Sequence, residues 1–199
     1  TGNNSTAIGQ NSQATQESTT ALGRNAEATA IRTTALGVSS EASGVEATAT
    51  GFETTASGAY ATTSGSRAIA SGNGSTASGA QSEAIADFTT AVGYDSLASA
   101  VNSTATGSNS QATGNNSTAI GQNSQATQEN ATALGRGAIA NGVNSLAVGA
   151  SNKSLADGTI SVGSNNNVSA IGSSAFGNNN VINSADTFVL GSNVNNSGQ

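Results

Sequence analysis

Residues 4–15 read Asn-Ser-Thr-Ala-Ile-Gly-Gln-Asn-Ser-Gln-Ala-Thr, and the same twelve residues return at 116–127. The glycine of this stretch recurs every 14 positions along the whole chain without an insertion. Because only 25 of the 199 residues are glycine, chance does not explain an unbroken row. The row consists of Gly9, Gly23, Gly37, Gly51, Gly65, Gly79, Gly93, Gly107, Gly121, Gly135, Gly149, Gly163, Gly177 and Gly191. A fixed period of this kind predicts a repeat architecture of fourteen coils.

Other rows keep the same period. The position four residues before each glycine is always Ser, Thr or Ala, and the position two before it is Ala in eleven coils. Five residues after the glycine, alanine is unbroken from Ala14 to Ala140. Fourteen residues are too few for a pair of helices, but they suit two short strands and two turns. In the first coil we expect strands at about 5–9 and 12–16.

Side chains alternate between the two faces of a strand, so the small rows share one face. We expect these rows to point inward, because a coil this short leaves room only for Ala, Ser and Thr between its sheets. The glycine row then marks a position with positive φ or a close backbone contact. The sequence predicts an all-β parallel roll that forms one domain over 1–199, with more degenerate coils from about residue 164.

The outward face of the first strand carries an apolar row. Its large members, with Phe188 from the neighbouring row, are Ile8, Leu22, Leu36, Val92, Ile120, Leu134, Val148, Val162, Phe176, Phe188 and Leu190. Soluble proteins avoid long exposed apolar stripes. The outward row of the second strand begins Gln13, Glu27, Glu41, Thr55 and is mostly polar. We therefore expect the first face to be buried by self-association, in a closed ring of few copies.

Composition excludes most catalytic chemistry and several partners. The chain has no His, Cys, Met, Pro or Trp, so it offers no imidazole base, thiolate or disulfide. We expect no enzyme activity, metal or cofactor. The net charge is −6 and the five basic residues are scattered, which argues against nucleic acid. Ile, Leu, Val and Phe together number only 31, too few for one thick core. No apolar run approaches a membrane span, and no signal peptide opens the chain.

The unit at 4–15 and 116–127 resembles the head repeat of YadA-like trimeric autotransporter adhesins, roughly Asn-Ser-Val-Ala-Ile-Gly-x-x-Ser-x-Ala. Leu146-Ala-Val-Gly149 and Ser161-Val-Gly163 match it closely, as does Ala170-Ile-Gly172 outside the 14-residue register. The resemblance implies a left-handed parallel β-roll, three chains side by side, and display at the bacterial outer membrane. It also implies a stalk and a membrane anchor outside these residues. The departure is Thr where the family usually has Val, in ten coils.

Four aromatic residues are candidates for ligand contacts. Phe52 and Tyr94 follow a row glycine, whereas Tyr60 and Phe88 fall in the opposite turn. Exposed aromatic residues serve as anchors in interfaces, although turn packing would also explain them. The predicted function is multivalent adhesion to host matrix proteins or abiotic surfaces.

Three other functions fit parts of the pattern. A surface fibre can use such a roll as a spacer with no ligand of its own. The row of ten threonines from Thr6 to Thr132 is similar to the arrays of ice-binding solenoids, but its companion row holds Ile, Leu and Val as often as Thr. Hexapeptide-repeat acyltransferases are also solenoids, but they have longer coils and a catalytic His that this chain lacks.

Overall fold

A computed structural model describes residues 1–197, and the chain divides into two units, Thr1–Asn102 and Ser103–Gln199. Each unit is built from seven coils, and each coil contributes one strand to each of two parallel sheets. We call the sheet of the odd-numbered strands sheet A and that of the even-numbered strands sheet B. Within the described residues there is no helix, and so none that could span a membrane.

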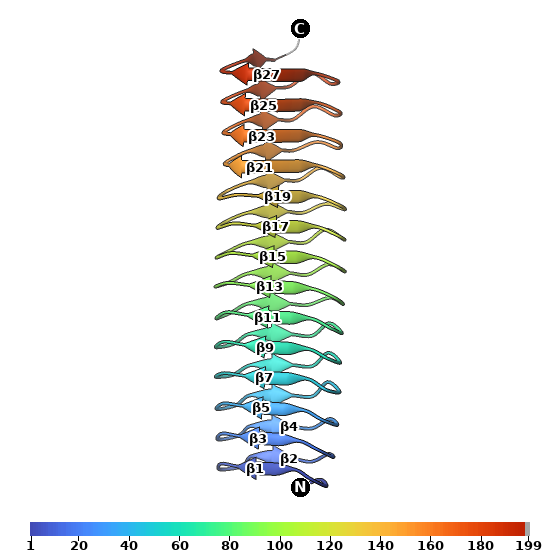
Figure 1. The fold of residues 1–199 in the computed structure, drawn as a ribbon, viewed down its shortest axis with the longest axis vertical. Coiled ribbons are helices and arrows are strands. Elements are labelled where there is room, and N and C mark those ends of the chain that lie inside the picture. The colour runs from blue at the N-terminus through green and yellow to red at the C-terminus, as the bar shows by residue number, and fades with distance from the viewer. Residues whose placement is uncertain (198–199) are drawn as a thin grey trace. The chain divides into compact units, whose positions relative to one another are not determined.

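In the first unit the strands of each sheet pair in chain order (Figure 1). Sheet A contains β1 (Thr6–Ile8), β3 (Thr20–Leu22), β5 (Thr34–Leu36), β7 (Thr48–Thr50), β9 (Thr62–Ser64), β11 (Thr76–Ser78) and β13 (Thr90–Val92). Sheet B contains β2 (Gln13–Ala14), β4 (Glu27–Ala28), β6 (Glu41–Ala42), β8 (Thr55–Ala56), β10 (Ile69–Ala70), β12 (Glu83–Ala84) and β14 (Leu97–Ala98).

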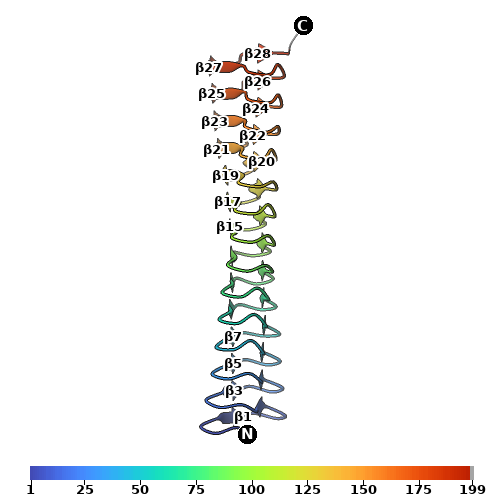
Figure 2. The ribbon, with the colours of Figure 1, turned by 90° about the vertical axis from the view of Figure 1, so that its right-hand side faces the viewer.

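The second unit repeats this order. Its sheet A contains β15 (Thr104–Thr106), β17 (Thr118–Ile120), β19 (Thr132–Leu134), β21 (Leu146–Ala150), β23 (Ile160–Ser164), β25 (Ser174–Asn178) and β27 (Phe188–Ser192). Its sheet B contains β16 (Gln111–Ala112), β18 (Gln125–Ala126), β20 (Ile139–Ala140), β22 (Lys153–Ser154), β24 (Asn167–Val168), β26 (Val181–Ile182) and β28 (Asn195–Asn196). Viewed from the side, the coils of each unit lie one above the next (Figure 2).

The register between coils is 14 residues throughout, as the glycine row predicts. Thr6, Ala7 and Ile8 lie opposite Thr20, Ala21 and Leu22, and the same step relates Gln13 to Glu27. The all-β parallel solenoid predicted from the sequence is therefore confirmed. The strands are shorter than expected, because only three residues of sheet A and two of sheet B enter the ladder in most coils.

The interior of each unit is as thin as the small rows predict. Ala21, Ala28 and Ala35 are fully buried, and so is Thr19, which stands in the Ser/Thr/Ala row. The buried hydroxyl groups close the turns: Ser40 Oγ donates to the carbonyl of Gly37 at 3.0 Å, and Ser124 Oγ donates to that of Gly121 at 2.9 Å. A serine or threonine at such an inward position is small enough for the narrow interior, and its hydroxyl group forms a hydrogen bond within its own turn.

Two turns close each coil. Turn A begins at the row glycine (Gly9–Ser12 in the first coil), and turn B leads back to sheet A (Gln16–Thr19). The third residue of both turns has a left-handed backbone, with φ of 57° at Asn11 and 59° at Ser18. The backbone ladder continues through the turns, because Asn25 N–H donates to Gln10 O at 2.8 Å and Arg32 N–H donates to Glu17 O at 3.0 Å. Each coil is therefore two similar seven-residue halves.

All fourteen row glycines have φ between 108° and 157°. Most of them also lie against the next coil: a Cβ added to Gly121 would stand 2.5 Å from the carbonyl oxygen of Gly135. These are the two conditions, positive φ and close backbone approach, that the sequence analysis expected of this row.

The later coils of the second unit have a different interior. Their sheet A strands, from β21 to β27, have five residues, and Val168 and Ile182 replace alanine among the fully buried side chains. Three buried asparagines, Asn152, Asn166 and Asn180, stand in the row that is Ser, Thr or Ala in the ten preceding coils. These coils include the region that the sequence marks as degenerate.

Candidate interaction surfaces

The outer face of sheet A carries a row of exposed apolar side chains in each unit. In the first unit Ile8 is 58% exposed and Leu22 and Val92 are also exposed; in the second, Ile120 is exposed and Leu190 is 78% exposed. The remaining predicted interface residues of this row, Leu36, Leu134, Val148, Val162 and Phe176, are partly exposed. Within each unit they lie on one face, because the inward positions between them are taken by the small rows. In the isolated chain this face is uncovered.

Two aromatic rings of this face contact each other in the last coils. The centroids of Phe176 and Phe188 lie 5.6 Å apart with the ring planes inclined by 42°, a favourable tilted arrangement. Phe188 remains exposed despite this contact. Self-association along sheet A would bury both rings.

Hydroxyl residues interrupt the apolar row of this face in the middle of the first unit. In β7, β9 and β11 both outward rows carry only hydroxyl groups, from Thr48, Thr50, Thr62, Ser64, Thr76 and Ser78. We call these six residues the polar waist. It separates the apolar row of β1, β3 and β5 from Val92 in β13.

The outer face of sheet B is more polar. Glu27 and Glu41 lie opposite each other in β4 and β6, and Gln13 Nε2 donates to Glu27 Oε1 at 3.5 Å. Its apolar residues, such as Ile69 and Leu97, alternate with charged or polar ones along the ladder. The two faces of each unit thus differ in the way that the two outward rows predict.

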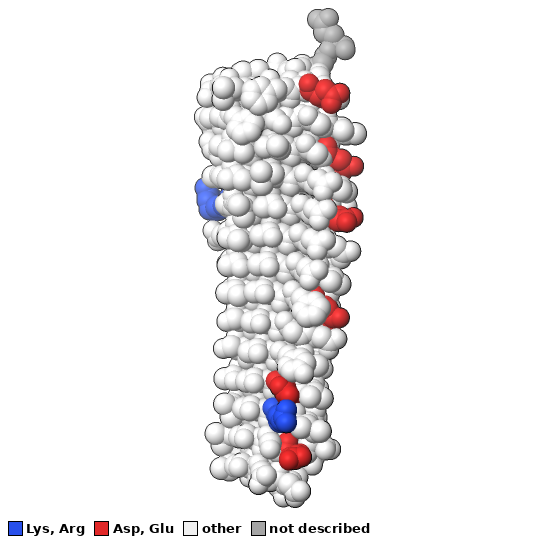
Figure 3. Space-filling view, turned by 45° about the vertical axis from the view of Figure 1, so that its right-hand side comes forward, with Lys and Arg blue, Asp and Glu red and all other residues white. Residues whose placement is uncertain are grey.

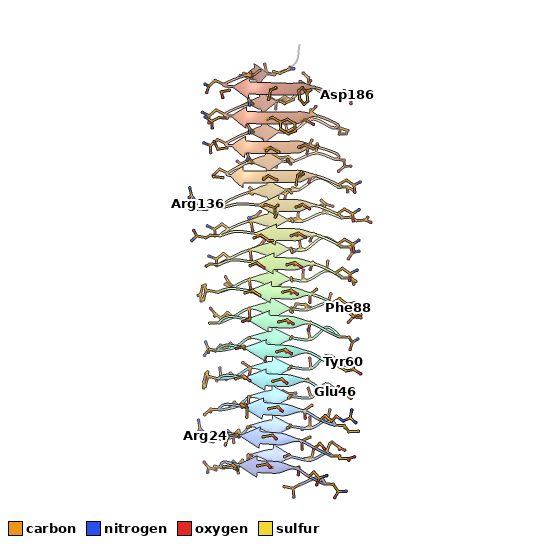
Figure 4. All side chains as sticks on the ribbon, viewed as in Figure 1. Arg24, Glu46, Tyr60, Phe88, Arg136 and Asp186 are labelled. Atoms are coloured by element: carbon orange, nitrogen blue, oxygen red, sulfur yellow. The ribbon has the colours of Figure 1, made fainter. Side chains whose placement is uncertain are left out.

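The four candidate aromatic residues all lie exposed on the turns of the first unit. Phe52 and Tyr94 occupy the second position of turn A. Tyr60 and Phe88 occupy the third position of turn B with φ of 60° and 57°, and they are 63% and 66% exposed. Figure 4 shows Glu46, Tyr60 and Phe88 along one edge, and Arg24 on the opposite edge. The structure therefore brings Tyr60 and Phe88 to one edge and Phe52 and Tyr94 to the other.

Charged side chains also lie mainly at the turns. Arg32 Nη1 and Glu46 Oε1 lie 2.8 Å apart on turn B, and Arg67 Nε and Glu53 Oε2 lie 2.9 Å apart on turn A. Each pair joins neighbouring coils at the same turn position. On the face shown in Figure 3 most side chains are uncharged, and the acidic ones gather toward the turn B edge of each unit.

The left-handed turn positions form a pattern that the sequence analysis missed. Among the described residues, every residue that combines a left-handed backbone with a long side chain lies between Arg32 and Phe88. These residues are Arg32, Glu46, Glu53, Tyr60, Arg67, Gln81 and Phe88. Outside that segment the same positions carry only Asn, Asp, Ser or Gly, which tolerate this backbone best. A search at a step of seven residues, from Asn4 and Asn11, would have revealed it.

In each unit the fold is a parallel β-solenoid with an apolar row on the outer face of one sheet and a more polar row on the outer face of the other. Comparison with protein families identifies the repeat: the model described as "YadA head domain repeat (2 copies)" matches residues 1–26, 28–54, 49–75, 70–96, 84–110, 98–124, 112–138, 126–152 and 140–166. The chain belongs to the YadA head family. Its domains are of adhesin type rather than an enzyme family, and they form trimers at the cell surface. No curated protein matches the sequence.

Proposed function

We propose that this chain is the adhesive head of a trimeric autotransporter on the bacterial outer membrane, and that it binds host matrix proteins or abiotic surfaces through many weak contacts. The single observation that carries the proposal is the uncovered apolar face of sheet A in a chain of the YadA head family. Three copies that pack these faces together would bury the row from Ile8 to Leu190. The homotrimer is part of the proposal.

Trimer packing leaves sheet B and the turns available for ligands. These surfaces repeat at every coil, about 4.8 Å apart along the ladder. A weak contact that is repeated along three chains gains strength from multivalency without any deep pocket. Phe52, Tyr60, Phe88 and Tyr94 are the proposed anchors, because they are large apolar groups exposed at the turns.

The test is adhesion of the trimerised chain to surfaces coated with collagen, fibronectin or laminin and to bare plastic. We expect binding to at least one of these surfaces, and a modest loss when any one of the four aromatic residues is replaced by serine. Replacement of all four should remove most of the binding. Loss of all adhesion through one such substitution, with the trimer intact, would replace the multivalent mechanism with a single discrete site.

A spacer without its own ligand is the second candidate, and one observation favours it for the second unit. There the left-handed turn positions carry only Asn, Asp, Ser or Gly among the described residues. Such short side chains stabilise the turn and present little to a partner. If the trimer adheres to none of the surfaces, the spacer function becomes the better explanation.

A further inference from the structure

The long side chains at left-handed positions between Arg32 and Phe88 are hard to explain by folding alone. Asn, Asp, Ser and Gly occupy the equivalent positions outside that segment, and they adopt this backbone at lower cost than Tyr or Phe. A bulky residue in this conformation is an outlier that points to a role for its side chain. Tyr60 and Phe88, with φ of 60° and 57°, are the aromatic members of the set, and both are exposed.

Tyr60 and Phe88 stand two coils apart on the turn B edge (Figure 4). Tyr60, Gly74 and Phe88 occupy the same turn position in three successive coils, and the N–H group of each donates to the preceding coil at 2.8 Å. The ladder therefore sets the two aromatic positions two strand spacings apart, about 9.6 Å along the stack of coils. On the turn A edge, by contrast, Phe52 and Tyr94 are three coils apart.

The place between the two aromatic positions is covered, and it forms no cavity. A Cβ added to Gly74 would lie 3.2 Å from Cδ1 and 3.4 Å from Cε1 of Phe88, so the Phe88 ring covers the Gly74 backbone. The Phe88 side chain is nevertheless 66% exposed, and the described residues contain no pocket. A ring that rests on a glycine and is open to solvent offers a platform for a ligand that lies along the surface.

An ordered amide lies between the two aromatic positions. Asn73 precedes Gly74 in the middle coil and is exposed. Its Oδ1 accepts the N–H of Ala59 at 3.1 Å, and its own N–H donates to Asp87 Oδ1 at 2.8 Å. These two bonds hold Asn73 in place with its Oδ1 directed to the preceding coil. The Nδ2 group of the same exposed amide can then donate to an acceptor on a ligand.

Exposed aromatic rings with an ordered amide between them suit a sugar chain. The apolar C–H face of a pyranose ring packs on an aromatic ring, and its hydroxyl groups bond to amides and carboxylates. The Asp87 carboxylate beside the site and the net charge of −6 disfavour an acidic glycan. A neutral glycan avoids this repulsion.

The two-coil spacing selects the linkage of the glycan. In an extended β-1,4-linked chain successive sugar rings are turned over, so alternate rings present the same face, at intervals close to two strand spacings. Tyr60 and Phe88 would contact alternate rings, and Asn73 would face the ring between them. An α-1,4-linked chain curves and does not keep this interval. Phe52 and Tyr94, at three coils, do not match it either.

From this geometry we propose that the turn B edge from Tyr60 to Phe88 binds an extended, neutral β-1,4-linked glycan that lies along the stack of coils. The inference goes beyond the proposed adhesive function, because it names a polysaccharide ligand and requires only one folded chain. In a trimer the site is present three times, so a polymeric glycan gains from multivalency.

The test is calorimetric titration of the full chain with cellohexaose and chitohexaose, which are β-1,4-linked, and with maltohexaose, the α-1,4-linked match of the first. We expect at least one β-linked sugar to bind, and maltohexaose to bind at least about fivefold more weakly than that sugar. Added salt should change the affinity little, because the ligand carries no charge. Binding of neither β-linked sugar, or equally tight binding of maltohexaose, would overturn the proposal.

Variants at the left-handed positions locate the site without straining the turn. Tyr60→Asn and Phe88→Asn should each weaken binding of the β-linked sugar at least about fivefold, because each removes one aromatic platform and asparagine suits this backbone. Arg32→Asn is the matched control. Arg32 occupies the same turn position with φ of 57°, and loss of its non-aromatic side chain should leave sugar binding unchanged.

A double variant tests the spacing itself. Gly74→Phe combined with Phe88→Gly keeps two aromatic residues in the row but sets them one coil, about 4.8 Å, apart. Removal of the Phe88 ring clears the space beside the new side chain at position 74, because no other atom lies within 4 Å of the added Cβ. Sugar binding should fall about as far as in Phe88→Asn. If the double variant binds as tightly as the unaltered chain, the two-coil spacing is not the basis of recognition and the proposal fails.

These measurements separate the glycan site from the proposed adhesive function. If Tyr60→Asn and Phe88→Asn fold, as circular dichroism reports, and bind the β-linked sugar as tightly as the unaltered chain, the site is wrong. Adhesion to protein-coated surfaces or plastic in a chain that binds no sugar would leave the proposed function standing. A chain that binds the sugar at this edge but adheres to none of those surfaces would support the site and contradict the proposed targets.

Discussion

At the scale of single residues, the glycines in the turns are of two kinds, which differ in whether the next coil leaves room for a side chain. Gly121 stands in the glycine row with φ of 131°, and its added Cβ would meet the backbone of Gly135. Gly137 is the third residue of turn A in the next coil and has φ of 66°. A Cβ added to it would have only the Ser151 hydroxyl within 4 Å, at 3.6 Å. The first position excludes any side chain, whereas the second merely favours residues that tolerate a left-handed backbone.

The substitution Gly121→Val should therefore lower the free energy of unfolding by about 3 kcal/mol or more per chain, because strain and a backbone clash add. Gly137→Asn should change it by less than about 1 kcal/mol. Urea unfolding followed by circular dichroism measures both. Equal midpoints for Gly121→Val and the unaltered chain would show that the row glycine is only tolerated, and not required.

Gln81 tests the strain at the left-handed positions directly. Its φ is 61° and its N–H donates to Ser66 O at 2.9 Å, so the backbone is fixed by the ladder. Gln81→Asn should raise the free energy of unfolding by about 0.5–1 kcal/mol, since asparagine adopts this conformation more readily. The reciprocal change Asn123→Gln, at the same turn position in the second unit, should lower it by a similar amount. If both changes had the same sign, backbone preference would not be the cause.

At the scale of elements, the buried asparagines of the second unit form a ladder of their own. Asn166 Nδ2 donates to Asn152 Oδ1, at 3.0 Å, and to the carbonyl oxygens of Val162 and Gly177, at 3.1 and 2.9 Å. Its Oδ1 accepts the N–H and the Nδ2 of Asn180, both at 3.0 Å. One side chain thus satisfies backbone groups of its own coil and of the following coil, and it also bonds to the Asn152 side chain of the preceding coil.

Asn166→Ala should lower the free energy of unfolding by about 3 kcal/mol, because it leaves several buried groups without partners. Ser124→Ala, in the same row, removes only the bond to Gly121 O and should cost about 1 kcal/mol. Hydrogen exchange should locate the loss: amides near Asn152 and Asn180 should exchange faster in Asn166→Ala. Equal effects of the two substitutions would show that the ladder adds nothing beyond one local bond.

The elements that the sequence predicted are those marked by one residue type at a fixed step. Alanine at Ala14 and Ala28 and glycine at Gly9 and Gly23 were enough to predict the coils, their register and their inward rows. The seven-residue half-coil was missed because Asn, Ser, Arg and Tyr all occur at its left-handed position. The asparagine ladder was missed because the inward row of Asn152, Asn166 and Asn180 carries only Ser, Thr or Ala in the ten preceding coils, and these side chains are smaller than an amide.

The placement of Tyr60 and Phe88 could be predicted in part. Their numbers differ by 28, so the 14-residue register alone places them at one turn position two coils apart. That register does not give the left-handed backbone of the two residues, with φ of 60° and 57°. This property becomes apparent only when each coil is divided into two seven-residue halves.

At the scale of the whole molecule, the proposed trimer places the polar waist in the interface, where its hydroxyl groups affect the free energy of association. The outward row of sheet A carries Thr50, Ser64 and Ser78 between apolar residues on either side in the sequence. If three copies of this face meet, these hydroxyl groups enter the interface and need hydrogen-bond partners. We expect ordered water or an anion to supply them, because the opposing rows are the same hydroxyl groups.

The substitution Thr50→Val should then tighten the trimer. Valine has nearly the shape of threonine but leaves no hydroxyl to satisfy, so each chain should gain about 0.5–1 kcal/mol on association. Three copies act together, and the concentration at which half the chains are trimeric should fall severalfold in sedimentation.

Thr55→Val is the matched control: Thr55 lies in β8 on the outer face of sheet B, where the proposed trimer does not bury it, and the substitution should leave association unchanged. If Thr55→Val tightened association and Thr50→Val did not, sheet B rather than sheet A would form the interface. A chain that sediments as a folded monomer at all concentrations would contradict the trimer itself.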